Sequence, residues 1–204
     1  LFNFFFLYMN ITTEMIKELR DATKVSIMQC KKALEEAGGD MEKATMLLRK
    51  SSAASAAKKG DRTLGAGVIG TYVHTTNRLG AMVELQCETD FVAQNPEFIA
   101  LASDIALHIS AMNPEFTDVA DIDETQTEKA RNFFLEEMAS IDKPAEIKEK
   151  ILSGKMDDYF AEKTLMKQPF VKNPDQTIAD LVNLLVQKTG ERIMIGKFTR
   201  FEIA

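Results

Sequence analysis

The sequence predicts an α+β protein in which a short helical part precedes a larger part made of helices and a small antiparallel sheet. Apolar residues recur at helical spacing over positions 12–59, alternate with period two over 67–87, and return to helical spacing after residue 95. A short stretch of Lys, Gly, Asp and Arg separates the first pattern from the second, as is typical of a linker. We therefore predict two domains, residues 9–62 and residues 63–204.

The first domain is predicted to contain three helices. Thr12 or Thr13 is suited to cap the first helix, which we expect to end at Asp21-Ala22-Thr23. Ser26 followed by Gln29 is a capping-box pattern, and it predicts the start of the second helix.

Two glycines, Gly38 and Gly39, mark the end of that second helix. Asp40 is then suited to cap the third helix, which we expect to continue into the Ser-, Ala- and Lys-rich stretch 51–59. The pattern predicts a bundle of three helices with a helical tail.

The second domain is predicted to begin with a β-hairpin. Ile69, Thr71 and Val73 would share one face of the first strand, and Ala81, Val83, Leu85 and Cys87 one face of the returning strand. Asn95 followed by Pro96 predicts the start of a helix. Further helices are expected at 127–139, 144–153, 155–165 (set off by Gly154) and 177–189, followed by a terminal strand that contains Ile193 and Ile195 and joins the sheet.

Charge and composition argue against several classes of protein. Residues 9–62 contain eleven basic and eight acidic side chains, whereas the rest of the chain is strongly acidic. An acidic surface repels phosphate backbones, so we expect no direct nucleic-acid partner. No apolar run is long enough to span a membrane, so we expect no membrane partner. The two cysteines are too few for a disulfide framework and suggest a cytoplasmic protein.

The first eight residues, 1–8, are apolar and uncharged and are followed by Met9. They lack the basic region and small-residue cleavage site of a signal peptide. We interpret them as an atypical extension or an artefact that precedes a start at Met9, and the alternative is a short apolar segment that binds another surface.

We find no convincing pattern for catalysis. The histidines, His74 and His108, lie in different predicted elements and the cysteines are isolated, which argues against a metal site. Neither a phosphate-binding loop nor a dinucleotide-binding glycine pattern is present. A nucleophilic pair of Cys87 and His74 remains an alternative, although Cys87 falls on an apolar face. We therefore expect a protein that is not an enzyme and needs no cofactor or metal.

Two places in the sequence carry candidate contacts to a partner. Thr89, Asp90, Phe91 and Val92 lie where the hairpin ends and a helix begins, a position at which loops often present side chains. From the residues alone, a structural role, in which Asp90 caps a turn and Phe91 fills the core, is favoured over contact with a partner. Ile27 and Met28, at the start of the second helix, are likewise compatible with either the core or a contact surface.

An ordered set of short motifs resembles the elongation factor Ts family, whose members release GDP from the GTPase elongation factor Tu. The resemblance spans residues 11–204. The matching motifs are Leu19-Arg20, Thr23, Cys30-Lys31-Lys32-Ala33-Leu34, Gly39-Asp40, Lys50-Ser51, Gly70-x-Tyr72-x-His74, Glu88-Thr89-Asp90-Phe91-Val92, Gln168-Pro169-Phe170-Val171 and Phe198-Thr199-Arg200-Phe201-Glu202.

The resemblance implies a fold and an assembly. The first domain would have the ubiquitin-associated type of three-helix fold. The chain resembles the short form of the family, with one core unit, rather than the long form with a duplicated core and a coiled-coil insertion. Short forms are associated with a homodimer that holds two copies of the GTPase. Thr199 stands where some relatives have a cysteine, so we expect no disulfide-linked dimer.

The resemblance also implies roles for individual residues. Phe91 would insert between helices of the GTPase, while Asp90 and the backbone of residues 89–92 would displace its magnesium ion. His74 would act near the phosphate-binding side of the nucleotide pocket. Ile27 and Met28 would dock the bundle, with Arg20 and Lys31 as charged residues at the rim.

Two features differ from the family pattern, and two other functions stay open. Residues 24–27 are less glycine-rich than expected, and the apolar octapeptide 1–8 is foreign to the family. One alternative function is a non-catalytic module that binds helices or ubiquitin-like partners on a dimerising core. The other is an enzyme that uses Cys87 and His74.

Overall fold

The computed structural model describes residues 11–139 and 143–203, so the predicted extension 1–8 lies outside the described residues. The fold is α+β, as predicted. The described chain forms two compact units, each discontinuous in sequence. Unit one contains residues up to 67 together with 86–94 and 180–194, and unit two contains the remainder. The predicted domain boundary between residues 62 and 63 is a statement about which parts fold independently. The division into compact units does not test independent folding, so that boundary stays a prediction.

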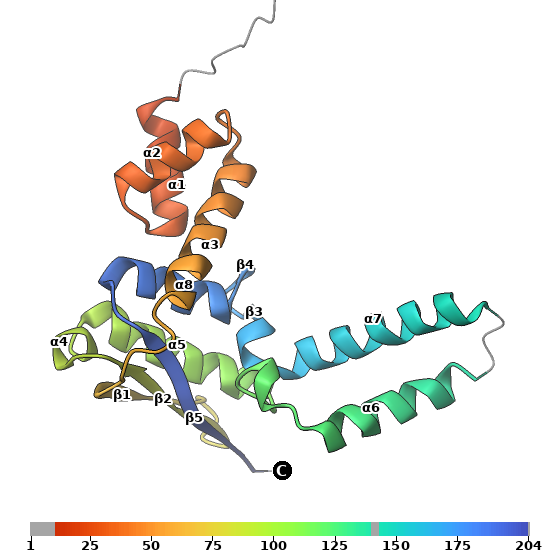
Figure 1. Ribbon diagram of the computed structural model, residues 1–204. Coiled ribbons are helices and arrows are strands. Elements are labelled where there is room, and N and C mark those ends of the chain that lie inside the picture. The colour runs from red at the N-terminus through yellow and green to blue at the C-terminus, as the bar shows by residue number, and fades with distance from the viewer. Residues whose placement is uncertain (1–10, 140–142, 204) are drawn as a thin grey trace, which may run out of the picture. The chain divides into compact units, whose positions relative to one another are not determined.

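Three helices form the bundle of unit one: α1 Thr13–Thr23, α2 Ile27–Glu36 and α3 Met41–Ala57 (Figure 1). The predicted caps are confirmed, because the side chains of Thr12, Ser26 and Asp40 each accept a backbone N–H of the helix that follows. Gly38 and Gly39 have positive φ angles of 64° and 85°, which favour glycine.

The helix α1 ends within the stretch Asp21-Ala22-Thr23, as predicted. The helix continues through Thr23, whose buried hydroxyl donates a hydrogen bond of 2.7 Å to the carbonyl oxygen of Leu19. This bond to the carbonyl four residues earlier satisfies the buried hydroxyl within the helix. Lys24, which has a positive φ of 57°, is the C-cap of the helix.

The bundle surrounds an apolar core. Leu19, Cys30 and Leu34 are fully buried there. Leu184, from the helix α8 (Ile178–Thr189), packs against the same cluster. Burial of these side chains, at about 25 cal/mol per Å² of apolar surface, is the main stabilisation of the bundle. The helices α1 and α2, with 11 and 10 residues, are too short to be stable alone.

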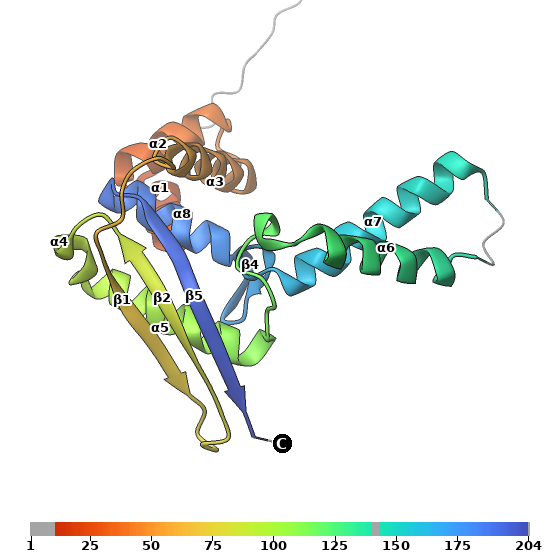
Figure 2. The same cartoon turned by 60° about the horizontal axis from the view of Figure 1, so that its bottom comes forward.

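The predicted hairpin is confirmed as β1 Ala66–Val73 and β2 Leu79–Cys87, and the predicted terminal strand as β5 Ile193–Glu202. The sheet order is β1-β2-β5, so β2 is the central strand (Figure 2). In unit two, α5 (Pro96–Met112) covers one face, and β1 approaches it closely at Gly70. A Cβ atom there would lie 2.2 Å from the carbonyl oxygen of Ala102.

The opposite face of the sheet in unit two carries exposed apolar side chains. Ile69, Thr71 and Val73 share this face, as predicted, and Val73 is 64% exposed. Met82 and Phe201 are also exposed, while neighbouring Arg200 donates to a backbone oxygen of α5. Since successive side chains of a strand alternate in direction, Phe201 points away from α5.

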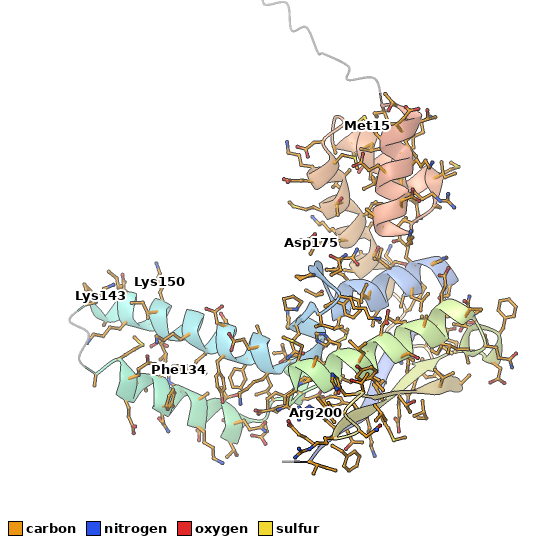
Figure 3. The ribbon with its side chains drawn as sticks, turned by 180° about the vertical axis from the view of Figure 1, so that it is seen from behind. Met15, Phe134, Lys143, Lys150, Asp175 and Arg200 are labelled. Atoms are coloured by element: carbon orange, nitrogen blue, oxygen red, sulfur yellow. The ribbon has the colours of Figure 1, made fainter. Side chains whose placement is uncertain are left out.

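Two long helices of unit two, α6 Glu124–Glu137 and α7 Ala145–Lys163, pack side by side (Figures 1 and 3). Phe134 on α6 lies against α7 and is buried with Met138 and Leu152. The expectation of separate helices divided at Gly154 is wrong, because α7 is continuous. An added Cβ at Gly154 would meet no atom within 4 Å, so this glycine weakens α7 by only about 1 kcal/mol.

The remaining short elements lie between the longer helices along the chain. The short helices η1 Val119–Asp121 and η2 Leu165–Lys167 flank the α6–α7 pair. Strands β3 Pro169–Phe170 and β4 Asn173–Thr177 pair antiparallel, a small sheet that was not predicted. No helix within the described ranges is long and apolar enough to cross a membrane.

Candidate partner-binding site

Residues 89–93, which we call the α4 tip, present one aromatic ring to solvent. The helix α4 (Asp90–Ala93) follows directly after β2, and Thr89 is its N-cap. The side chain of Phe91 is 85% exposed, whereas the next two residues, Val92 and Ala93, are buried. The two buried side chains anchor the short helix, and the ring projects from it. The alternative in which Phe91 fills the core is wrong.

Asp90 stands beside Phe91 in the first and only turn of α4 and is exposed. A carboxylate at a helix N-terminus is stabilised by the free N–H groups there. Its side chain and the ring of Phe91 therefore form an acidic and aromatic pair on the surface. Val92 differs from the other three predicted contacts in having a buried side chain, so only its backbone is available to a partner.

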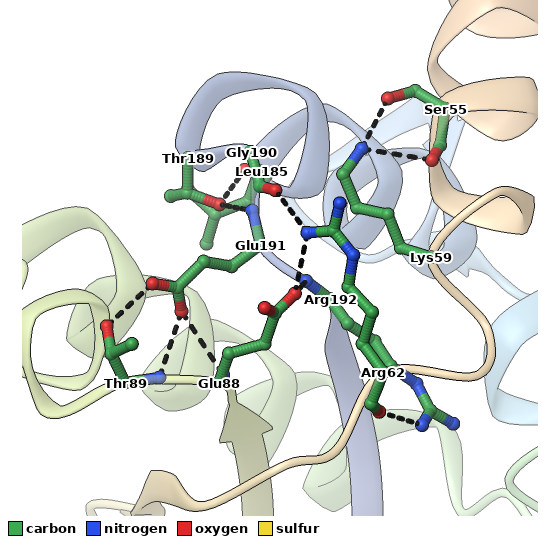
Figure 4. Close-up of polar contacts among 10 residues, drawn as sticks. All are labelled: Ser55, Lys59, Arg62, Glu88, Thr89, Leu185, Thr189, Gly190, Glu191 and Arg192. Atoms are coloured by element: carbon green, nitrogen blue, oxygen red, sulfur yellow. Dashed lines mark hydrogen bonds and ion pairs between the residues drawn. The ribbon is translucent and has the colours of Figure 1, made fainter.

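The start of the α4 tip is held by polar contacts from the segment after α8 (Figure 4). The carboxylate of Glu191 accepts the backbone N–H groups of Glu88 and Thr89, each at 3.1 Å, and the Thr89 hydroxyl at 2.6 Å. In return, the carboxylate of Glu88 accepts the backbone N–H of Arg192 at 2.5 Å and the guanidinium of Arg62 at 3.1 Å. We call this set the tip clamp.

The tip clamp lowers the pKa of one of its two carboxylates, that of Glu88. The N–H of Arg192 holds the pKa of Glu88 below its usual value, and Arg62 contributes in the same direction. Arg62 also donates to the carbonyl oxygen of Gly190, the residue that ends α8. No pattern in the sequence pointed to Glu191 or Arg192, because they lie about a hundred positions from the residues that they contact.

The second candidate contact lies at the start of α2. Met28 is 81% exposed and Ile27 is 56% exposed, so the alternative that they belong to the core is wrong. Arg20 is exposed, and Lys31 forms a solvent-exposed ion pair with Glu35 at 3.8 Å. Such exposed pairs contribute little to stability, which leaves Lys31 available to a partner.

A cavity of about 350 Å³ adjoins this helix start within unit one. Three basic residues line it without an acidic one, together with polar and aliphatic groups. The lining residues are Arg20, Lys24, Val25, Ser26, Gln29, Leu184, Gln187 and Lys188. The positive lining is consistent with an acidic protein surface as the partner of the bundle.

His74 belongs to unit two, where it follows β1 at the hairpin turn. Its side chain is half-buried, and Nδ1 lies 3.2 Å from the Thr76 hydroxyl. The Tyr72 ring meets the imidazole edge-on, with centroids 6.4 Å apart. The turn therefore fixes the imidazole ring through Nδ1.

The remaining nucleophilic and titratable candidates are enclosed in the fold. Cys87 is fully buried, its thiol donates to the carbonyl oxygen of Thr89, and burial raises its pKa. A buried thiol with a raised pKa is a poor nucleophile, which argues against the enzyme alternative. His108 is also fully buried: it contacts Gln168 through Nε2 at 2.9 Å and accepts the N–H of Val171 through Nδ1. Burial lowers its pKa, so it is a neutral structural residue.

Metal binding has no support in the part of the chain that the structure describes. Within residues 11–139 and 143–203, His, Cys, Asp and Glu side chains form no group of three that could hold an ion. Both cysteines are free.

The fold and the site together define a class of protein. An N-terminal three-helix bundle precedes an α+β core, and the exposed ring of Phe91 projects from an anchored helix start. Aromatic side chains are enriched at protein–protein interfaces.

Comparison with known proteins identifies the family. The family model described as elongation factor TS matches residues 4–204. An elongation factor Ts from Carboxydothermus hydrogenoformans is 45% identical over 193 residues, covering 95% of this chain and 89% of the relative. Those from Thermodesulfovibrio yellowstonii and Thermotoga petrophila are each 44% identical over 195 residues, covering 96% of this chain and 97% of the relative. The chain belongs to the elongation factor Ts family of translation elongation factors.

Proposed function

We propose that this protein binds elongation factor Tu in its GDP form and promotes GDP release by displacing magnesium and stabilising the nucleotide-free GTPase. The observation that carries the proposal is the exposed ring of Phe91 on an anchored helix start. It acts by binding, without chemistry of its own. As a translation factor it would work in the cytoplasm.

The energetic requirement is moderate. Accelerating release about 10⁴-fold requires lowering the barrier by roughly 5 kcal/mol. Burial of a Phe side chain supplies about 1.5–3 kcal/mol. The rest must come from other contacts that form only in the nucleotide-free state, because an interaction that is equally strong in both states does not shift the equilibrium.

The proposed roles divide between the two candidate contacts and the hairpin. Phe91 enters an apolar gap between helices of the GTPase, and Asp90 with the backbone from Thr89 to Val92 disturbs its magnesium site. Ile27 and Met28 dock the bundle, with Arg20 and Lys31 at the rim. His74 approaches the phosphate side of the nucleotide pocket.

We also propose that the protein is a homodimer that binds two copies of elongation factor Tu. The support is the uncovered sheet face in unit two, where Val73 and Phe201 are each more than 60% exposed. Several exposed apolar side chains on one face of a sheet are typical of an interface. Val73→Lys together with Phe201→Lys is expected to give monomers in sedimentation equilibrium; an unchanged dimer would exclude this face as the interface.

One other function has specific support. The exposed pair Ile27 and Met28, beside a cavity with three basic lining residues, would also suit a module that binds an acidic helix or a ubiquitin-like protein. In that case the α4 tip would have no role, and Phe91→Ala would leave partner binding and nucleotide release unchanged.

The test of the proposed function is nucleotide release from elongation factor Tu. The GTPase is loaded with a fluorescent GDP, mixed with an excess of unlabelled GDP, and followed with and without this protein. We expect strong acceleration that saturates with protein concentration and weakens as magnesium is raised. Release at the spontaneous rate at every concentration would contradict the proposal.

A further inference from the structure

The geometry points to Glu191 as a positioning residue that sets the orientation of the α4 tip. This inference rests on the proposed function, and it assigns to one carboxylate, far away in the sequence, the task of holding Asp90 and Phe91 in the direction from which they meet the partner.

The helix α4 cannot hold its own direction. It contains four residues, fewer than the number at which a helix becomes stable in water. Its buried residues Val92 and Ala93 fix its far end. The near end depends on what holds the extended residues before it, Glu88 and Thr89.

Glu191 holds that near end through three acceptor contacts. One oxygen, Oε2, accepts the N–H groups of both Glu88 and Thr89, and the other, Oε1, accepts the Thr89 hydroxyl. The hydroxyl is thereby oriented with its lone pairs free, and it accepts the N–H of Val92 at 3.5 Å as the N-cap of α4. The same carboxylate thus fixes both the strand end and the cap.

Glu191 is itself held in place. Its backbone N–H donates to the hydroxyl of Thr189 at 3.3 Å, at the end of α8. The neighbouring Arg192 donates its N–H to Glu88 and a side-chain N–H to the carbonyl oxygen of Arg62 at 2.6 Å. The tip clamp is therefore reciprocal: each of its two carboxylates accepts backbone N–H groups from the segment that carries the other (Figure 4).

This arrangement predicts a specific kinetic effect. Glu191 holds residues 88 and 89 from the segment after α8, and its proposed role needs no contact with the partner. Its loss should misdirect Phe91 without weakening the docking of the bundle. Misplacement of a contact group by about 1 Å can reduce a rate by up to about 100-fold. We expect a fall in the maximal rate of GDP release with little change in the concentration at half-saturation.

The experiment compares Glu191→Ala, Glu191→Gln and a matched control, Glu128→Ala, in the full-length protein. Glu128 is an exposed glutamate on α6, outside the proposed contacts. We expect Glu191→Ala to lower the maximal release rate on the order of tenfold. Glu191→Gln keeps one acceptor oxygen and should lie between it and the wild type. Glu128→Ala should match the wild type.

Two further measurements separate positioning from general destabilisation. Hydrogen exchange at the Thr89 and Val92 amides should accelerate in Glu191→Ala, while the amides of α2 stay unchanged. Thr89→Val, which removes the hydroxyl, should add little to Glu191→Ala in the double variant, because both changes release the same cap. Thr89→Ser, which keeps the hydroxyl, should retain more of the release rate than Thr89→Val.

Three results would overturn the inference. They are a maximal rate in Glu191→Ala within about twofold of wild type, a loss of rate in strict proportion to a general loss of folded protein, and full additivity with Thr89→Val. If the wild type accelerates release and only Phe91→Ala impairs it, the proposed function stands and the positioning role falls. If the wild type does not accelerate release, the proposed function itself fails, and amide exchange still reports whether Glu191 holds the tip.

Discussion

Two helix starts in unit one carry exposed apolar side chains, and they are held in different ways. At α2, Ser26 caps the helix and its hydroxyl donates to Gln29 of the same turn at 2.8 Å. At α4, Thr89 caps the helix and is itself held by Glu191, about a hundred residues further along the chain. The first start is supported locally and the second by tertiary contacts.

The difference suggests a division of work between the two starts. Ile27 and Met28 project from a helix of ten residues, and a flexible Met adapts to an imperfect partner surface. Phe91 is a stiff ring on a clamped turn, which suits a group that must enter a gap in one orientation. We therefore expect the α2 start to control affinity and the α4 tip to control the rate of nucleotide release.

The largest expected effect is that of Phe91→Ala. The maximal rate of GDP release from elongation factor Tu should fall about 10- to 100-fold, since roughly 1.5–3 kcal/mol of apolar burial is lost. Because the ring is 85% exposed in the free protein, the melting temperature should stay within about a degree of the wild type. Fluorescent-GDP release and thermal unfolding measure the two quantities. An unchanged rate would assign the task to another group.

A smaller effect is expected for Ile27→Ala and Met28→Ala. The concentration at half-saturation should rise about fivefold for each, which corresponds to roughly 1 kcal/mol of docking energy, while the maximal rate changes little. The same release assay, run over a range of protein concentrations, separates the two parameters. If these variants lowered the maximal rate as Phe91→Ala does, the proposed division between the two starts would be wrong.

Acid should loosen the α4 start before the α2 start. The pKa of Glu88 is held below its usual value of 4.5 by the N–H of Arg192 and by Arg62, so its stabilisation is fully present above about pH 4.5 and is lost as the pH falls through the lowered value. The cap at α2 joins Ser26 to a neutral Gln29 and has no such dependence. Amide signals of Thr89 and Gln29, followed by NMR from pH 6 to pH 3.5, should diverge. Simultaneous loss of both would argue against the clamp.

The smallest effect on GDP release is expected for Cys87→Ala, a change two positions before the α4 tip. The variant loses buried contacts and a weak thiol bond to the carbonyl oxygen of Thr89, so the free energy of unfolding should fall by about 1 kcal/mol. The rate of GDP release should remain within about twofold of the wild type, because three contacts from Glu191 still hold the tip. A loss comparable to that of Phe91→Ala would revive the enzyme alternative.

The sequence predicted those features that depend on neighbours along the chain. The caps at Thr12, Ser26 and Asp40 follow from residue types a few positions apart, and the hairpin follows from a two-residue period. The prediction that Gly154 separates two helices was wrong. The packing of α7 outweighs the low helical propensity of one glycine at an open position.

The residues of the candidate site could be predicted from the sequence, but the contacts that hold them in place could not. The family resemblance pointed to Asp90 and Phe91, but their exposure depends on which neighbours are buried. Glu191 is an ordinary glutamate in the sequence, and only the pairing of β5 with β2 brings it to the loop before α4. Contacts between residues so far apart leave no local periodicity for a single sequence to reveal.

The most direct test of the proposed role of Phe91 identifies what its ring touches. Position 91 is replaced by the photoreactive analogue benzoylphenylalanine, the protein is mixed with elongation factor Tu, and the mixture is irradiated with and without an excess of GDP and magnesium. We predict a crosslink to the GTPase domain that is strong without nucleotide and suppressed by GDP, because two ligands that oppose each other must do so reciprocally. A crosslink of equal yield in both conditions, or no crosslink while nucleotide release proceeds, would contradict the proposed insertion of Phe91 into the nucleotide-free GTPase.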